Sequence, residues 1–414
     1  MRKDKLFNKD FLLLWQGQTV SQLGSQIFSI ALMFWIKHAT GSATLMGTVM
    51  MLSMLPAALL GPVSGAIVDN LPRKKLVIFS DIINGINVIV LASVVGFSLL
   101  SVDLTIILIF IFSTISGVLF SIFNPAITAS IPDLVPEDKL QSANSMQESV
   151  HHLSLFIGQA LGGIFYTIFG APLLFLFDGI TYLFSAFSES FIEFPHRKRE
   201  KHTSLKETFN HYKKESLDGL QYVWNEKGIR FIFISFSVMT FFIMPFVVLL
   251  PFYVEDTLKL TPDWYGYIFG AFGLGSIFGY IISSLVNAKG KLRTVTVLAG
   301  LLIMGGLMPV FGFITNGYLA IATMLIIGIA DGYFTVNVIT VLQLKINPDM
   351  RGRVFGVLNS ISIGLAPFSM AIAGITADIL DHYIPPIFIF CGLFTFLTCL
   401  VSAFSKHYKD FLAG

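Results

Sequence analysis

Long apolar stretches of this sequence contain carboxyl groups, where an ionisable side chain could do chemistry, and four of them are considered as candidates. Asp331 lies at the middle of its stretch, with no Lys or Arg within two helical turns. Glu148 lies near the start of another stretch and is followed by two histidines, whereas Asp81 and Asp178 lie nearer the ends of theirs. Burying a charge is costly unless it is paired. Asp331 and Glu148 are therefore our candidates for reversible proton binding, and a structural carboxyl held by backbone and hydroxyl donors is the alternative for each.

Amide side chains form a second set of candidates. Gln18, Gln22 and Gln26 recur every four residues, so a helix would place them on one face. A polar row on an apolar helix must face protein or water, because lipid offers it no hydrogen-bond partner. We expect this row to line a substrate cavity. Three single amides inside other apolar stretches are further cavity candidates, although a hydrogen bond between helices is the simpler interpretation of each: Asn124, Asn337 and Asn359.

The stretches that carry these residues are apolar and long enough to cross a membrane. Hydrophobic residues make up 54% of the chain and charged residues 13%, whereas soluble proteins have roughly 25% charged residues. A membrane-spanning helix needs about 20 apolar residues. The sequence therefore predicts an all-α integral membrane protein with twelve transmembrane helices. They are expected near residues 11–36, 43–68, 75–100, 104–128, 143–168, 172–194, 230–254, 264–286, 294–314, 318–343, 353–378 and 384–404.

Lys and Arg residues are sorted between the two sides of this predicted bundle. All 27 of them except Lys37 and Lys259 fall at alternate junctions between the apolar stretches. Cytoplasmic loops retain Lys and Arg during insertion. We therefore expect a multi-pass protein of the cell membrane (the inner or plasma membrane) with both termini in the cytoplasm. The basic residues are spread over separate junctions, which argues against binding to nucleic acid.

A polar, basic segment divides the chain into two parts. We expect an N-terminal six-helix bundle over 1–194, a cytoplasmic linker over 195–229 and a C-terminal six-helix bundle over 230–414. The linker is either an amphipathic helix on the inner membrane surface or a solvated helix that joins two bundles. Its apolar residues recur at helical spacings: Leu205, Phe209, Tyr212, Leu220 and Val223.

The two predicted bundles echo each other in sequence. Ile127 matches Ile339, and Gly162 matches Gly374, at one constant offset. A few identities could arise by chance, but they agree with the equal number of apolar stretches in each part. Paired six-helix repeats with a binding site between them are the architecture of many secondary transporters.

The junction after the second stretch carries a short motif, formed by Gly65, Asp69, Arg73 and Lys74. Gly65 permits close helix approach, and Asp69 can accept hydrogen bonds at a neighbouring helix start. The two basic residues hold the loop in the cytoplasm. The motif resembles the G-x-x-x-D-x-x-x-R-K signature of the major facilitator superfamily, in which this loop acts as a gating latch between the halves. A plain membrane-boundary loop is the alternative.

Three further segments resemble exporters of that superfamily. Gly158, Gly162 and Gly163 resemble the G-P-x-x-G-G pattern of its exporters, in which small residues allow tight helix packing. The opening segment 8–26 and the run 351–355 resemble the macrolide-efflux branch, which includes siderophore exporters. The resemblance implies two six-helix halves and an efflux activity.

We therefore expect a secondary active transporter that exports an amphipathic small molecule, such as a macrolide-like drug, by proton antiport with alternating access. Its partners would be the substrate, protons and membrane lipid. We expect a monomer that uses the proton gradient and no cofactor. Cys391 and Cys399 lie in the last apolar stretch and are not expected to bind a metal. The alternatives are another cargo (a siderophore, a lipid or an imported nutrient) and, less favoured, a membrane enzyme or scaffold. The sequence contains no H-E-x-x-H, G-x-S-x-G or Walker motif, so we expect no enzymatic activity.

Overall fold

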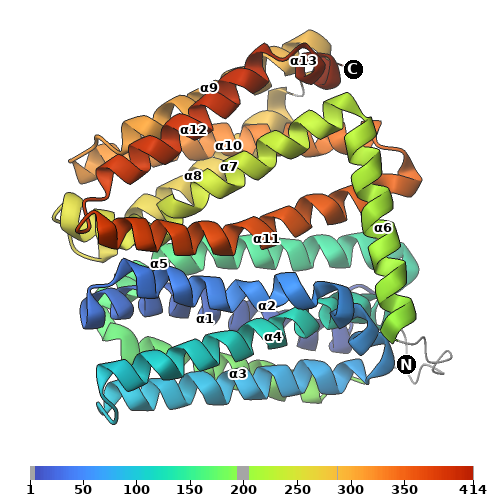
Figure 1. Cartoon of the computed structure of the whole chain (residues 1–414). Coiled ribbons are helices and arrows are strands. Elements are labelled where there is room, and N and C mark those ends of the chain that lie inside the picture. The colour runs from blue at the N-terminus through green and yellow to red at the C-terminus, as the bar shows by residue number, and fades with distance from the viewer. Residues whose placement is uncertain (1–4, 194–204, 287, 414) are drawn as a thin grey trace. The chain divides into compact units, whose positions relative to one another are not determined.

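A computed structural model describes residues 5–193, 205–286 and 288–413, and these residues are almost entirely helical (Figure 1). The helices are α1 (Lys9–Thr40), α2 (Ala43–Asn70), α3 (Arg73–Gly96), α4 (Val102–Leu134), α5 (Leu140–Ser190), α6 (Leu205–Asn225), α7 (Lys227–Phe252), α8 (Asp263–Val286), α9 (Gly290–Phe311), α10 (Gly317–Lys345), α11 (Pro348–Ile379), α12 (Pro385–Phe404) and α13 (Lys406–Ala413). Short turns of other helix types, Glu137–Lys139 and Tyr253–Thr257, precede α5 and follow α7. Among the described residues, eleven helical segments are long and apolar enough to cross a membrane. The predicted all-α membrane fold is confirmed.

The helix α5 covers two of the predicted crossings. Its 51 residues contain one non-helical position, Gly170, with φ 71° and ψ 170°. Only glycine adopts this region readily, and the position falls between the predicted spans 143–168 and 172–194. At about 1.5 Å per residue, 51 residues are long enough to cross the membrane twice. Eleven helical segments thus accommodate the twelve predicted stretches.

The two arms of α5 run in opposite directions along α1. In the first arm, a Cβ atom on Gly158 would meet Gln26, and one on Gly162 would meet Ile30, so the arm is parallel to α1. In the second arm the order is reversed, because Gly17 faces Ser185 and Gly24 faces residues 178 and 181. The chain therefore turns back at Gly170 and holds α1 between the two arms.

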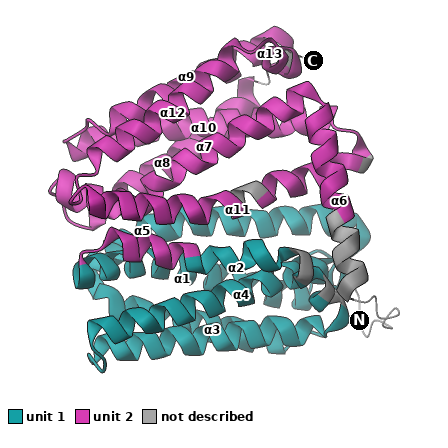
Figure 2. Ribbon diagram, viewed as in Figure 1, with its two compact units in different colours: residues 1–40, 52–213 teal, residues 41–51, 214–414 magenta. Residues whose placement is uncertain are grey.

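The chain divides into two compact units (Figure 2). Unit 1 comprises residues 1–40 and 52–213, and unit 2 comprises residues 41–51 and 214–414. In unit 1, α3 packs against both α4 and α5. In unit 2, α8 packs on α10, α9 packs on α12, and α7 contacts α11 and α12. The predicted division at residues 194 and 230 stays a prediction.

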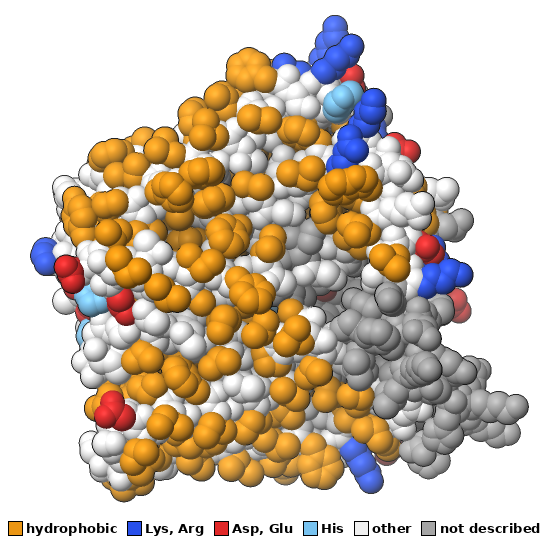
Figure 3. All heavy atoms as spheres, viewed as in Figure 1, with side chains coloured by type: hydrophobic (Ala, Val, Ile, Leu, Met, Phe, Trp, Pro, Cys, Tyr) orange, Lys and Arg blue, Asp and Glu red, His pale blue; other side chains and the backbone are white. Residues whose placement is uncertain are grey.

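The amphipathic pattern of α3 is the reverse of that in a soluble protein. Its large apolar side chains recur on the outer face and are exposed: Phe79, Ile83, Ile86 and Val90. Its polar side chains recur on the inner face and are buried: Ser80, Asp81, Asn84 and Asn87. Hydrophobic side chains likewise spread over the face of the molecule drawn in Figure 3, with charged side chains towards its margins. Such a surface fits a lipid environment, in which polar groups must find partners inside the protein.

The contact between α1 and the first arm of α5 predicts a stability effect at Gly162. A Cβ atom there would lie 2.8 Å from Cβ of Ile30, which is buried and branched at Cβ, so its rotamer has little freedom. We expect Gly162→Ala to destabilise the protein by about 1–3 kcal/mol through overpacking, seen as a lower melting temperature in detergent.

The matched control for this substitution is Gly61→Ala. A Cβ atom on Gly61 would meet no described atom within 4 Å, and alanine favours the helix by roughly 0.5–1 kcal/mol over glycine. Equal melting temperatures for the two variants would contradict the packing described for α1 and α5.

Candidate functional site

A group of buried carboxyl side chains lies among α1, α3 and α5 in unit 1. Asp81 belongs to α3, and Asp178 and Glu189 belong to the second arm of α5. Their exposed fractions are 1%, 0% and 1%, respectively. We call these three residues the carboxyl cluster. Carboxyl groups inside a membrane bundle are expensive and are commonly functional, so the carboxyl cluster is the candidate site.

Glu189 is tied to the row of glutamines on α1. Its Oε1 atom accepts a hydrogen bond of 2.9 Å from Nε2 of Gln18 and one of 3.4 Å from Oγ of Ser185. The Oε1 atom of Gln18 in turn accepts a 3.3 Å bond from Nε2 of Gln22. Two amides and a carboxyl group thus form a chain of hydrogen bonds from α5 into α1.

Asp178 is surrounded by hydroxyl groups. Its Oδ1 atom accepts a 3.3 Å hydrogen bond from Oγ1 of Thr181 and lies 3.3 Å from Oγ of Ser25. The same hydroxyl of Ser25 lies 2.9 Å from the hydroxyl of Tyr182. Neutral donors, and not cations, therefore face this carboxyl group.

Asp81 lies next to Ser185 and Glu189 and close to Asp178, so the three carboxyl groups share one environment. Among the described residues, four of the six carboxyl oxygens have no hydrogen-bond partner: Oδ1 and Oδ2 of Asp81, Oδ2 of Asp178 and Oε2 of Glu189. The described Lys, Arg and His residues form no ion pair with any of the three. Burying an unpaired charge costs several kcal/mol, so this environment suits groups that bind protons.

The sequence contains a signal for the carboxyl cluster that our sequence analysis used only in part. Residues 178, 182, 185 and 189 recur at helical spacing, as do residues 18, 22 and 25, so each helix carries a polar stripe. We ranked Asp81 and Asp178 below other candidates because they lie near the ends of their stretches, and we did not single out Glu189. The partner of the glutamine row was missed because the two stripes are far apart in sequence.

The two predicted proton-coupling residues lie in different units. Asp331 is half-buried on α10 in unit 2, near Tyr280 of α8. Glu148 is exposed near the start of α5 in unit 1, close to His151. The structure brings neither of them into the carboxyl cluster.

The predicted cavity amides have different surroundings. Gln26 accepts a 3.2 Å hydrogen bond from Nε2 of Gln159, which joins α1 to the first arm of α5. Asn337 is buried, and its Nδ2 atom donates to Oγ of Ser283 at 2.9 Å and to a carbonyl of its own helix at 2.8 Å. Asn124 and Asn359 are exposed on α4 and α11. The contact of Asn337 with α8 is of the kind that holds helices together.

The predicted gating loop is anchored within unit 1 by its two basic residues. Nη1 of Arg73 lies 2.7 Å from Oδ2 of Asp133 near the end of α4. Nζ of Lys74 donates to the carbonyl oxygens of residues 190 and 192 at 2.7 and 2.8 Å, where a cation is favourable at the end of α5. A Cβ atom on Gly65 would meet no described atom within 4 Å. The side chain of Asp69 lies outside the described part of the chain.

The ion pair of the loop predicts a second stability effect. The side chains of Arg73 and Asp133 are only 16% and 18% exposed, and hydrogen bonds to charged groups contribute about 1.5–3 kcal/mol. We expect Asp133→Ala to lower the melting temperature in detergent, because it leaves the guanidinium group without its carboxylate. Asp138→Ala is the matched control, since Asp138 is 70% exposed in its pair with Lys139 and should have little effect. An equal drop in melting temperature in both variants would show that the pair of Arg73 and Asp133 stabilises the protein no more than an exposed ion pair does.

The family of this chain follows from comparison with known proteins. Residues 14–368 match the family described as Major Facilitator Superfamily. The match covers most of the sequence, so the chain belongs to the Major Facilitator Superfamily. The resemblance inferred from the motifs is therefore confirmed.

Two relatives are efflux proteins. Macrolide efflux protein A of Streptococcus pyogenes is 26% identical over 384 residues, which cover 91% of this chain and 92% of the relative. Multidrug efflux pump Tap of Mycolicibacterium fortuitum is 25% identical over 377 residues, which cover 89% of each chain. The similarity to these relatives extends over nearly the whole chain.

Solved transporter structures share the fold. A bacterial homologue of the iron transporter ferroportin has a TM-score of 0.72 at 15% identity, with coverage of 97% of this chain and 100% of that one. The nucleoside transporter NupG has a TM-score of 0.68 at 13% identity, with coverage of 94% and 97%. At these identities the likeness concerns the fold.

Proposed function

We propose that this protein exports an amphipathic small molecule, such as a macrolide-like compound, in exchange for protons. The observation that carries the proposal is the carboxyl cluster, whose three buried acids form no ion pair with the described Lys, Arg and His residues. Efflux relatives that match along nearly the whole chain support export. The protein would act in the cell membrane with both termini in the cytoplasm.

The proposed cycle is alternating access, in which the halves 1–194 and 230–414 rock about a central cavity. Protons that enter from outside neutralise the carboxyl cluster and lower its affinity for a bound cationic compound, which leaves. Release of these protons to the cytoplasm restores the affinity. Each turn of the cycle thus moves protons inward and the compound outward.

The hydrogen-bond chain on α1 is a route by which the two events are linked. Gln18 donates to Glu189 and accepts from Gln22. When the proton of Glu189 sits on Oε1, the O–H group is a donor, and the amide of Gln18 has to reverse so that its oxygen accepts from it. The reversal would pass to Gln22, one of the predicted cavity residues.

Substitutions in the carboxyl cluster test the proposal directly. In proteoliposomes with an imposed pH gradient, we expect Asp178→Asn, Asp81→Asn and Glu189→Gln each to abolish gradient-driven accumulation of substrate. An amide keeps the shape of the side chain but cannot release a proton. Substrate binding should be weaker than in the unchanged protein, because an amide resembles the protonated, low-affinity form of each carboxyl group. In Glu189→Gln the amide oxygen can still accept from Gln18, so the hydrogen bond between α1 and α5 is kept.

The matched control is Asp103→Asn, because Asp103 is an exposed carboxyl in the first turn of α4. The panel of compounds should contain macrolides, lipophilic cations and siderophores. Normal gradient-driven transport in all three cluster variants would refute the assignment of proton coupling to the cluster.

Asp331 and Glu148 are tested in the same assay. Our sequence-based hypothesis expects the double variant Asp331→Ala and Glu148→Ala to lose proton-coupled efflux, because one of the two carboxyl groups would carry the exchange. Unchanged coupling in this double variant, with normal folding, would refute that hypothesis while leaving the carboxyl cluster in place.

A different cargo is the second candidate function. A siderophore, a lipid or an imported nutrient could be moved by the same fold, since solved structures that share it include transporters of other solutes. Accumulation of each compound in expressing and non-expressing cells, with and without an uncoupler, distinguishes these cargoes and the direction of transport.

A further inference from the structure

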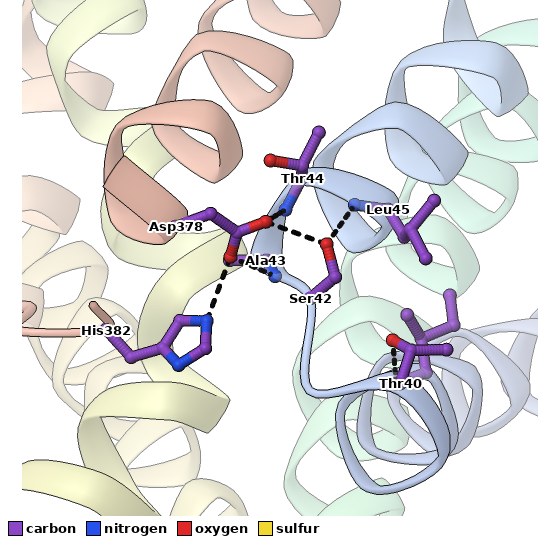
Figure 4. A network of polar contacts seen from close by, with 8 residues as sticks. Thr40, Ser42, Ala43, Thr44, Leu45, Asp378 and His382 are labelled. Atoms are coloured by element: carbon purple, nitrogen blue, oxygen red, sulfur yellow. Dashed lines mark hydrogen bonds and ion pairs between the residues drawn. The ribbon is translucent and has the colours of Figure 1, made fainter. Parts of the chain in front are cut away.

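A carboxylate near the end of α11 binds the start of α2 (Figure 4). Oδ2 of Asp378 accepts hydrogen bonds from Oγ of Ser42 at 2.7 Å and from the backbone N–H of Thr44 at 2.9 Å. Oδ1 accepts from the backbone N–H of Ala43 at 2.8 Å. All of these residues belong to unit 2. Residues more than 330 positions apart in sequence are thus joined by one side chain.

This contact is an N-terminal helix cap supplied from another helix. The first N–H groups of a helix have no partner within the helix, and a residue just before the helix usually supplies one. Ser42 does so here, because its Oγ atom accepts from the N–H of Leu45 at 3.2 Å. Asp378 satisfies two further N–H groups and places a negative charge at the positive end of the helix dipole.

The surroundings of Asp378 hold it in place. Nε2 of His382 lies 2.9 Å from Oδ1 of Asp378, and the imidazole ring lies 5.1 Å from the ring of Phe252 between centroids. The backbones of α2 and α11 also meet closely here, since a Cβ atom on Gly374 would meet the carbonyl oxygen of Ala43. The cap is therefore part of a tight contact between two transmembrane helices.

We propose that Asp378 is a latch that joins the start of α2 to the end of α11 and releases once in each transport cycle. The inference rests on the proposed function, because alternating access requires the two predicted halves to separate at one side of the membrane. α2 belongs to the first predicted half and α11 to the second. Charge sorting predicts that Ser42 and Asp378 lie at the outer side, so release of the latch opens the cavity outwards.

The latch can be tested by labelling a cysteine at a buried position beside it. Ala43 is 0% exposed, so a cysteine introduced by Ala43→Cys should react with a membrane-impermeant maleimide only when α2 leaves α11. The background carries Cys391→Ala and Cys399→Ala. We expect Asp378→Asn to raise the external labelling rate in intact cells by roughly fivefold, because the amide keeps only one acceptor oxygen and loses the negative charge at the positive end of the helix dipole. Ser42→Ala removes one of the three hydrogen bonds from this segment to Asp378 and the bond from Leu45 to Ser42. It leaves the carboxylate and both backbone bonds to it in place, so it should give a smaller rise.

Two controls separate release of the latch from general unfolding. Asp381→Asn changes an exposed carboxyl three residues away, at a position with φ 47° that asparagine tolerates, and should leave the rate unchanged. The second control uses a protein that has Cys399 as its single cysteine and Ala43 unchanged. Cys399 is 0% exposed in α12 and should stay unlabelled in each variant.

The outcomes are distinct. A higher labelling rate at the cysteine introduced by Ala43→Cys, without labelling of Cys399, supports the latch. If Asp378→Asn does not fold, the labelling rate in Ser42→Ala provides the test. The latch would be overturned if the labelling rate at position 43 did not exceed that in Asp381→Asn, or if Cys399 became labelled to the same extent. The labelling needs neither substrate nor a proton gradient, so loss of transport in proteoliposomes with a normal latch would count against the proposed function only.

Discussion

Lipid offers no hydrogen-bond partner, and this constraint explains why many polar side chains of the described helices lie buried in the bundle. On α3 the constraint produces an exposed apolar face and a buried polar face. On α1 and α5 it turns two polar stripes towards each other, so that Gln18 meets Glu189 and Ser25 meets Asp178. The helices therefore pack in the arrangement that satisfies their few polar groups, and apolar side chains fill the remaining surface.

Two kinds of carboxyl group result, and they differ in what surrounds them. Asp378 has its negative charge matched by two backbone N–H groups and a hydroxyl, all supplied by the start of α2. The carboxyl cluster has fewer donors than acceptor oxygens among the described residues, and Asp81 has no hydrogen-bond partner there. The first kind suits a contact between helices, and the second suits a group that gains and loses protons.

The fold was largely predictable, because membrane-spanning helices are encoded by length and apolarity within a single stretch. The break at Gly170 was also predictable, since it falls between two such stretches. The candidate site was less predictable from the sequence than the fold. The helical period revealed the glutamine row of α1, but nothing local in the sequence shows that Gln18 pairs with a residue 171 positions away. Asp178 was a weaker candidate because it lies near the end of its apolar stretch. Position along a stretch is a poor guide to burial in the folded bundle, where Asp178 is 0% exposed.

The position of α1 between the two arms of α5 has a consequence for biosynthesis. α1 is made first, whereas the carboxyl partner of Gln18 is made 171 residues later. At about 5–20 residues per second, the ribosome needs on the order of ten seconds or more to supply it. During that interval the amides of α1 need a temporary host, such as the insertion machinery or water at the bilayer surface. We therefore expect unit 1 to close late in translation, when the returning arm of α5 enters the bilayer.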